Sequence, residues 1–77
     1  MMKERYYFTQ LAAALECAIH ADVGLAGLKI LIHGWIAKGG IVRQTLAMRK
    51  TRAGEEFLTY FEAKAFSEYA GYDLTSD

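Results

Sequence analysis

The chain has 77 residues, of which 53% are apolar or aromatic and 23% are charged, and its formal net charge is zero. This length is that of one small domain, and we expect residues 1–77 to form a single helical unit. The one cysteine, Cys17, excludes an intramolecular disulfide framework and is typical of a reducing compartment.

The apolar fraction is high for so small a domain. A domain of this length buries only about 60% of the surface that its unfolded chain exposes, so large apolar side chains would remain outside. We therefore expect part of the apolar surface to be a subunit interface, most simply that of a homodimer. The first seven residues lack the apolar core of a signal peptide, and charged residues interrupt the most apolar stretch, 23–42. These features predict a cytoplasmic protein with no membrane partner.

The first predicted element is a helix over about 7–21. Its apolar positions recur with the helical period: Tyr7, Leu11, Ala14, Leu15, Ala18 and Ile19. Thr9, alone or together with Gln10, is expected to cap its start, and the segment Asp22-Val23-Gly24 provides the signal that ends it.

A second helix is predicted over about 25–38. One side carries Leu25, Leu28, Ile32, Trp35 and Ile36. Ile30 and Leu31 extend the apolar surface nearly all round, which predicts a central helix that its own chain covers on one face and a neighbour on the other. Gly27 and Gly34 lie seven residues apart, where a partner backbone could approach, and Gly39-Gly40 is a strong C-terminal signal.

The segment 41–51 permits either a helix or a strand, and as a strand its expected partner is the segment 3–8. A third helix is predicted over about 54–70, with Glu55 and Glu56 in its first turn and Gly71 at its end. Its predicted buried face consists of Phe57, Leu58, Phe61, Ala65 and Tyr69. Tyr60 and Phe66 lie off that face and are expected to be exposed at an interface.

The sequence offers little that predicts catalysis, and we expect neither enzyme activity nor a metal or cofactor. Glu16 and His20 are four residues apart, which is typical of an exposed pair on one helix. His33 is expected to be a buried or interface histidine, and Cys17 a small structural residue without a nearby base. Gly39-Gly40 lacks the residues of a phosphate-binding loop.

Charge is unevenly distributed along the chain. Between Val23 and Gly54 the sequence has six positive residues and no carboxylate, whereas residues 55–77 sum to −5. Clustered cations without carboxylates are typical of surfaces that bind phosphate backbones. The predicted nucleic-acid-binding residues are Lys38, Arg43, Gln44, Arg49, Lys50 and Arg52. The alternative is a solvated basic face paired with glutamates such as Glu55, Glu56, Glu62 and Glu68 of the same or a neighbouring chain.

The segment Lys50-Thr51-Arg52-Ala53-Gly54-Glu55-Glu56-Phe57-Leu58 resembles the strand-to-helix junction Leu-Thr-x-x-Gly-x-x-Phe-Leu of winged-helix DNA-binding proteins. In that family the preceding helix often ends with Gly and an aliphatic residue, as Gly40-Ile41 does here. The resemblance covers about a quarter of the chain and implies DNA binding. The sequence departs from the pattern, because Lys50 replaces an aliphatic residue and only one clear helix precedes the second. A wing hairpin would also need a turn within 41–50 that the residues do not signal.

The sequence thus predicts a mainly α fold of three helices with a basic connecting segment, 41–52. The first functional hypothesis is a small regulatory protein that binds nucleic acid through the segment Lys38–Arg52. The second is a protein–protein interaction module, such as an inhibitor, an adaptor or an antitoxin-like factor. The residues predicted for an interface are Gly27, Leu31, Gly34, Trp35, Tyr60 and Phe66.

Overall fold

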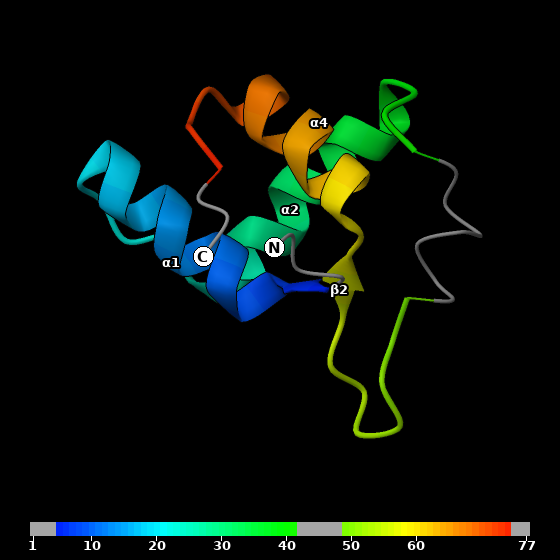
Figure 1. Ribbon diagram of the computed structural model, residues 1–77. Coiled ribbons are helices and arrows are strands. Elements are labelled where there is room, and N and C mark those ends of the chain that lie inside the picture. Colours follow the sequence, from blue (N-terminus) through cyan, green and yellow to red (C-terminus); the bar gives the residue numbers. More distant parts are fainter. Residues whose placement is uncertain (1–4, 42–48, 75–77) are drawn as a thin grey trace.

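The structure, a computed structural model, describes residues 5–41 and 49–74. In chain order the elements are β1 (Tyr6–Tyr7), α1 (Phe8–Ile19), α2 (Gly24–Ala37), β2 (Phe57–Leu58) and α4 (Tyr60–Ala70) (Figure 1). The prediction of a small, mostly helical protein with three helices is confirmed. The short antiparallel sheet, in which Tyr6 faces Leu58 and Tyr7 faces Phe57, was not predicted.

The first helix, α1, lies within the predicted range 7–21. The Gln10 side chain, rather than that of Thr9, caps the start of the helix: Gln10 Oε1 accepts the Tyr7 backbone N–H at 3.2 Å. The helix ends at His20, whose φ of 57° is left-handed. Leu11 and Leu15 are buried as expected, but Ile19 is exposed.

The second helix, α2, agrees best with the prediction. It packs against both α1 and α4 (Figure 1). The residues buried on it are Leu28, Ile32, Trp35 and Ile36. At its end Gly40 donates its N–H to the Trp35 carbonyl at 3.0 Å and lies so close to the indole ring that a Cβ atom would overlap it.

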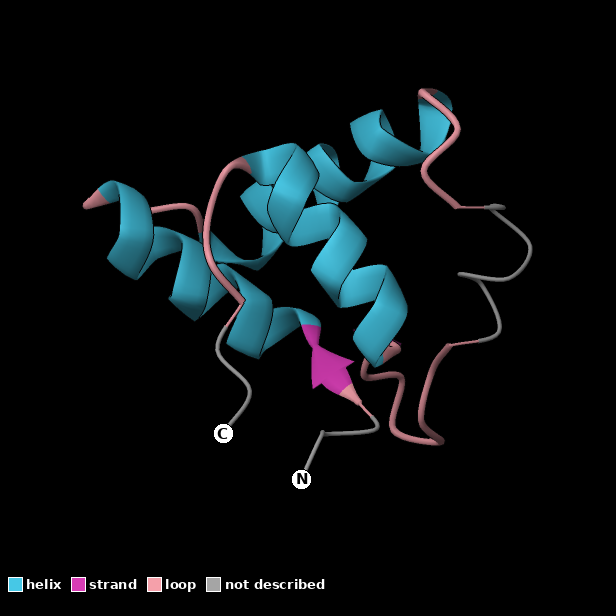
Figure 2. Ribbon diagram, turned by 45° about the horizontal axis from the view of Figure 1, so that its top comes forward, coloured by secondary structure: helices cyan, strands magenta, loops and turns pink. Residues whose placement is uncertain are grey.

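The predicted start of the third helix at residue 54 is wrong. Residues Phe57 and Leu58 form β2, and α4 begins at Tyr60. Thr59 is its N-cap: Thr59 Oγ1 accepts the Glu62 N–H at 3.4 Å, and Glu62 Oε1 accepts the Thr59 N–H at 2.9 Å. This reciprocal capping box fixes the start of the helix at Tyr60, six residues after Gly54. Figure 2 shows the strand region, in magenta, beside the starts of α1 and α4.

The predicted buried face of the third helix is also wrong. Phe61 is 76% exposed and Tyr69 is 42% exposed, whereas Phe66 is fully buried and Tyr60 is half-buried. The reason is that Phe57 and Leu58 belong to a strand and do not set the helical phase. The residues of α4 that face the core are Ala63, Phe66 and Ser67. The Phe66 ring lies 5.5 Å from the Trp35 ring, centroid to centroid, and so joins α4 to α2.

Candidate nucleic-acid interface

A hairpin precedes α4 and carries part of the basic segment. The Phe57 N–H donates to the Arg49 carbonyl at 3.1 Å, and Lys50 and Glu56 form an antiparallel bridge. The Thr51 N–H donates to the Glu55 carbonyl at 3.0 Å, which closes a turn over residues 52–54. The turn requires glycine at position 54, where φ is 83°. The hairpin projects from the helices (Figure 1), and its turn lies after Lys50 rather than within 41–50.

Two basic side chains of this hairpin are exposed. Lys50 and Arg52 lie on its first arm and in its turn, and both are exposed to solvent. Glu55 is exposed on the second arm, so the hairpin is positive by one charge when only these three residues are counted. Neither Lys50 nor Arg52 belongs to the ion pairs formed by the described residues.

Helices α1 and α2 form a bent pair that precedes this hairpin in the sequence. Only residues 20–23 separate them, and their axes cross at 92°. Glu16 holds the corner, because its Oε2 accepts the backbone N–H groups of both Val23 and Gly24 at 2.8 Å. The hydrogen bond from the Gly24 N–H, and to a smaller extent that from the Val23 N–H, hold the pKa of Glu16 below its ordinary value. The predicted role of Glu16, an exposed pair with His20, did not include these hydrogen bonds to the start of α2.

The hairpin is attached to α2 at its base. Lys29 Nζ lies 3.0 Å from Glu56 Oε1, and the Glu56 carbonyl accepts the Phe8 N–H at 3.0 Å. Glu56 therefore connects the second arm of the hairpin both to α2 and to the start of α1. These contacts join the N-terminal half of α2 and the hairpin into one surface.

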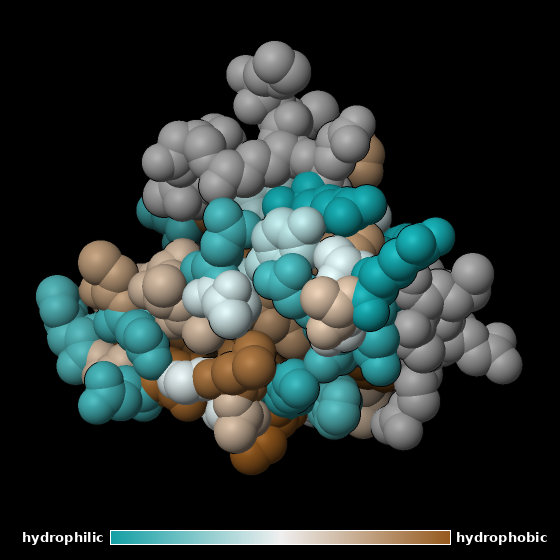
Figure 3. Space-filling view, turned by 90° about the horizontal axis from the view of Figure 1, so that it is seen from below, coloured by the Kyte–Doolittle hydropathy of each residue, from teal (hydrophilic) through white to brown (hydrophobic). Residues whose placement is uncertain are grey.

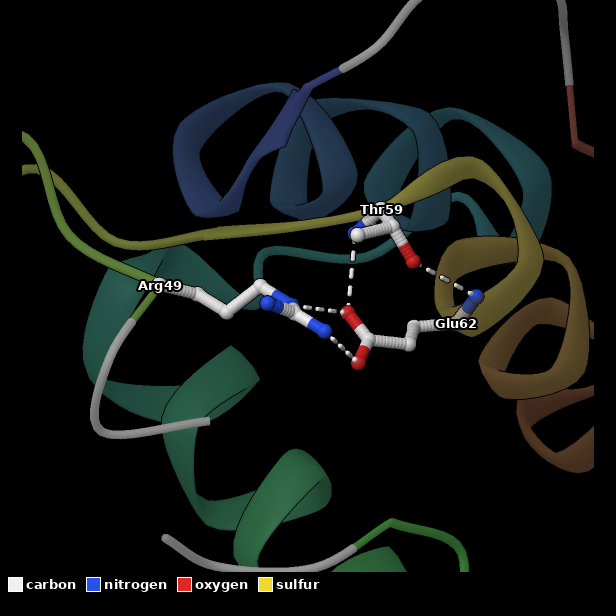
Figure 4. Close-up of polar contacts among 3 residues, drawn as sticks. All are labelled: Arg49, Thr59 and Glu62. Carbon is white, nitrogen blue, oxygen red and sulfur yellow. Dashed lines mark hydrogen bonds and ion pairs between the residues drawn. The ribbon is translucent and has the colours of Figure 1, made fainter. Parts of the chain in front are cut away.

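Arg49 is engaged within the chain rather than free. Its Nε and Nη2 atoms donate to the two carboxylate oxygens of Glu62 at 2.8 and 3.0 Å (Figure 4). Burial raises the pKa of Glu62, but hydrogen bonds from Arg49 and Thr59 outweigh it, so this pKa lies below its ordinary value. The hydrogen bond with Glu62 also raises the pKa of Arg49. Arg49 and Lys29 therefore pair with glutamates of the same chain, Glu62 and Glu56. The sequence had left such pairing open as the alternative to phosphate binding.

The remaining predicted binding residues are dispersed. Lys38 caps the C-terminal end of α2, and its Nζ lies 5.5 Å from the centre of the Tyr69 ring. Lys38 lies nine positions after Lys29, about 13.5 Å further along the helix, so the structure does not bring Lys38 to the base of the hairpin. Arg43 and Gln44, and with them most of the segment 41–51, lie outside the described residues.

The residues predicted for an interface separate into two groups. Trp35 and Phe66 are buried within one chain, so their side chains offer no exposed surface. Leu31 is exposed, and Gly27, Gly34 and Tyr60 are half-buried. The homodimer itself stays a prediction.

The described residues show no metal-binding cluster of three or more His, Cys, Asp or Glu side chains.

A hollow of about 380 Å³ beside α4 is lined by residues that include Lys64, Glu68 and Tyr72. The buried Tyr72 hydroxyl has no hydrogen-bond partner among the described residues, and burial raises its pKa to about 12. Cys17 and His33 are both exposed, so His33 is not buried within the chain, and its place at an interface stays a prediction.

Seen from below, on the side toward which the hairpin projects, apolar atoms gather near the lower centre and hydrophilic atoms lie to the left and right (Figure 3).

In the part of the chain that is described, no single helix has the length and apolar character to cross a membrane. Helices α1 and α2 meet these criteria only when taken together, as a pair bent by 92°.

Comparisons with protein-family models, with curated proteins and with solved structures find no match to this chain. Any function must therefore be inferred from the geometry of the chain itself.

Proposed function

We propose that this protein is a small, non-enzymatic regulator that binds duplex DNA through α2 and the hairpin at residues 49–57. The observation that carries the proposal is the crossing of α1 and α2 at 92° across a four-residue connection. The helix-turn-helix units of DNA-binding proteins are helix pairs of this kind, which cross at about 90–120° over a turn of about three or four residues. In these units the second helix enters the major groove with its N-terminal residues nearest the bases.

The charge on the proposed surface is compatible with DNA. No Asp or Glu occurs between Val23 and Gly54, so α2 carries no carboxylate. Lys50 and Arg52 are exposed on the hairpin, and the Lys29–Glu56 ion pair fixes the hairpin base to α2. With α2 in the major groove, the hairpin would contact the adjacent phosphates, where each neutralised phosphate releases counterions.

This proposal differs from the sequence hypothesis in its division of roles. Lys50 and Arg52 are the phosphate contacts. Arg49 is a positioning residue, because its guanidinium pairs with Glu62 and orients the first arm of the hairpin. Lys38, at the far end of α2, is not required.

The groove dimensions favour DNA over double-stranded RNA. The major groove of B-DNA is wide enough to admit an α-helix, whereas that of A-form RNA is deep and narrow. We expect fluorescence anisotropy to show binding to duplex DNA that exceeds binding to duplex RNA of the same sequence at the same salt concentration.

The salt dependence of DNA affinity tests which cations make contact. We expect Lys50→Ala combined with Arg52→Ala to reduce the slope of log K against log salt by about 2, since each phosphate contact contributes about 0.9. The titration covers about 50 to about 200 mM salt. Lys64→Ala, an exposed lysine of α4 on another face, is the matched control and should leave the slope unchanged. An unaltered slope in the Lys50/Arg52 double variant would contradict the proposal.

A second candidate function, protein–protein interaction, has support from α4. Phe61 and Tyr69 are exposed aromatic residues on this helix, and neither side chain is needed for the proposed DNA contact. Aromatic side chains are enriched at protein interfaces. If these two residues mediate self-association, Phe61→Ser combined with Tyr69→Ser should lower the sedimentation coefficient of the protein at concentrations where the wild type is dimeric. An unchanged coefficient would exclude α4 as the contact.

A further inference from the structure

The outward side of α2 is apolar although solvent surrounds it. Ile30 is 73% exposed, more than any other large aliphatic residue among those described. Ala26 and His33, four residues before and three after it, are exposed as well. Residues at these spacings lie on one face of a helix. We call Ala26, Ile30 and His33 the outer face of α2.

This face does not contribute to the core of its own chain. The core side of α2 consists of Leu28, Ile32, Trp35 and Ile36, which are buried. A single exposed isoleucine needs no explanation on an ordinary surface. Here, however, it lies in the N-terminal half of the helix that the proposed function places in the major groove.

The charges around the outer face also suit a position in the major groove of DNA. Lys29 precedes Ile30 and holds the hairpin base through Glu56, so the basic hairpin adjoins this part of α2. No residue of α2 itself carries a carboxylate, and Glu16, which accepts the N–H groups of Val23 and Gly24, is an acidic side chain at its start. The outer face is thus apolar at Ala26 and Ile30 and polar at His33, and it lies beside the basic hairpin.

The groove offers one apolar group that such a strip can contact. In the major groove only thymine presents a methyl group, and alanine and other apolar side chains bind it by simple contact. The ring nitrogens of His33 can donate to or accept from the base edges beside it. We propose that the outer face of α2 recognises the 5-methyl groups of thymine, so that the preferred ligand is A·T-containing duplex DNA. This inference rests on the proposed function.

A change in the DNA rather than in the protein provides the first test. An alternating A·T duplex is compared with the same duplex in which uracil replaces thymine, which removes each methyl group and retains base pairing. The wild type should bind the thymine duplex more tightly by about fourfold for each methyl group contacted, the value that corresponds to burial of one methylene.

Two variants assign the effect to the outer face. Ile30→Ala should bind the two duplexes with nearly equal affinity, because it lacks the side chain that contacts the methyl group. Phe61→Ala removes an equally exposed apolar side chain from α4 and should preserve the wild-type ratio of affinities. Sedimentation of each variant, without DNA, reports its oligomeric state in parallel.

The outcomes distinguish this inference from the function on which it rests. Equal affinity of the wild type for both duplexes, with a salt slope that still depends on Lys50 and Arg52, would overturn methyl recognition and leave the proposed function intact. Absence of binding to either duplex at about 50 mM salt would overturn both. If Ile30→Ala converts a dimer to a monomer, the outer face is a contact between copies of the chain, and the inference is wrong.

Discussion

Glu62 connects the hairpin to α4, and its replacement should have a large effect on stability. Its carboxylate accepts two hydrogen bonds from Arg49 and a third from the Thr59 backbone (Figure 4). The side chains of Arg49 and Glu62 are only 28% and 14% exposed, so solvent screens the pair less than it would an ordinary surface pair. Loss of the capping hydrogen bond should cost about 1 kcal/mol, and loss of the bidentate pair about 1–2 kcal/mol.

Glu62→Ala should therefore lower the free energy of unfolding by about 2–3 kcal/mol, which for a domain of this size corresponds to a fall in Tm of about 10–20 °C. Thermal and urea denaturation followed by circular dichroism measure the change. Glu68→Ala, an exposed glutamate of the same helix, is the matched control and should change the stability by less than about 0.5 kcal/mol. The double variant Arg49→Ala/Glu62→Ala should be less destabilised than the sum of the single variants, since the partners share one interaction. Equal stability of Glu62→Ala and Glu68→Ala would refute the reasoning.

Two further predictions concern pH and packing. The pKa values of Glu16 and Glu62 lie below the ordinary 4.5 in the folded chain, so their contribution to stability is complete above that pH and declines as the pH falls. The free energy of unfolding should accordingly decrease between neutral pH and pH 3. The decrease should be less steep for Glu62→Gln than for the wild type. If the free energy of unfolding fell with pH at the same slope in both proteins, Glu62 would not be linked to folding. Gly40→Ala should destabilise the protein by about 1–3 kcal/mol, because its Cβ atom would overlap the Trp35 ring. Wild-type Tm and unchanged tryptophan fluorescence in this variant would show that the contact is absent in solution.

The helical period predicted α1 and α2 because their buried residues repeat regularly. Leu11, Leu15, Leu28 and Ile32 are at the predicted positions on the core side of each helix. Trp35 was placed correctly on the core side of α2, but it was also assigned to an interface. The interface assignment followed from the high apolar fraction of the sequence, which was taken to exceed what one small core can bury. The single chain nevertheless buries both Trp35 and Phe66 in its core.

The start of α4 was missed because two signals compete in the sequence. Glu55 and Glu56 suggested a first helical turn, whereas Thr59 and Glu62 form a capping box three residues apart. A search for that spacing would have located the start correctly and separated Phe57 and Leu58 from the helix. Strands of two residues have no period that a sequence pattern can reveal.

The candidate site was only partly predictable from sequence. The absence of carboxylates drew attention to Lys50 and Arg52, which are indeed exposed. The partner of Arg49 lies 13 residues further along the chain, beyond the range of any local pattern. The crossing angle of α1 and α2 depends on how the helices pack, and the connecting residues alone did not reveal it.

The most direct test of the central claim is to map the surface that contacts DNA. In ¹⁵N-labelled protein titrated with a short A·T duplex, amide resonances of residues 24–33 and 49–56 should shift together, while those of α4 from Phe61 to Ala70 should remain largely unchanged. Saturable shifts confined to α2 and the hairpin are the result that we predict. Shifts confined to α4, or no shifts at about 50 mM salt, would contradict the assignment of this surface to DNA binding.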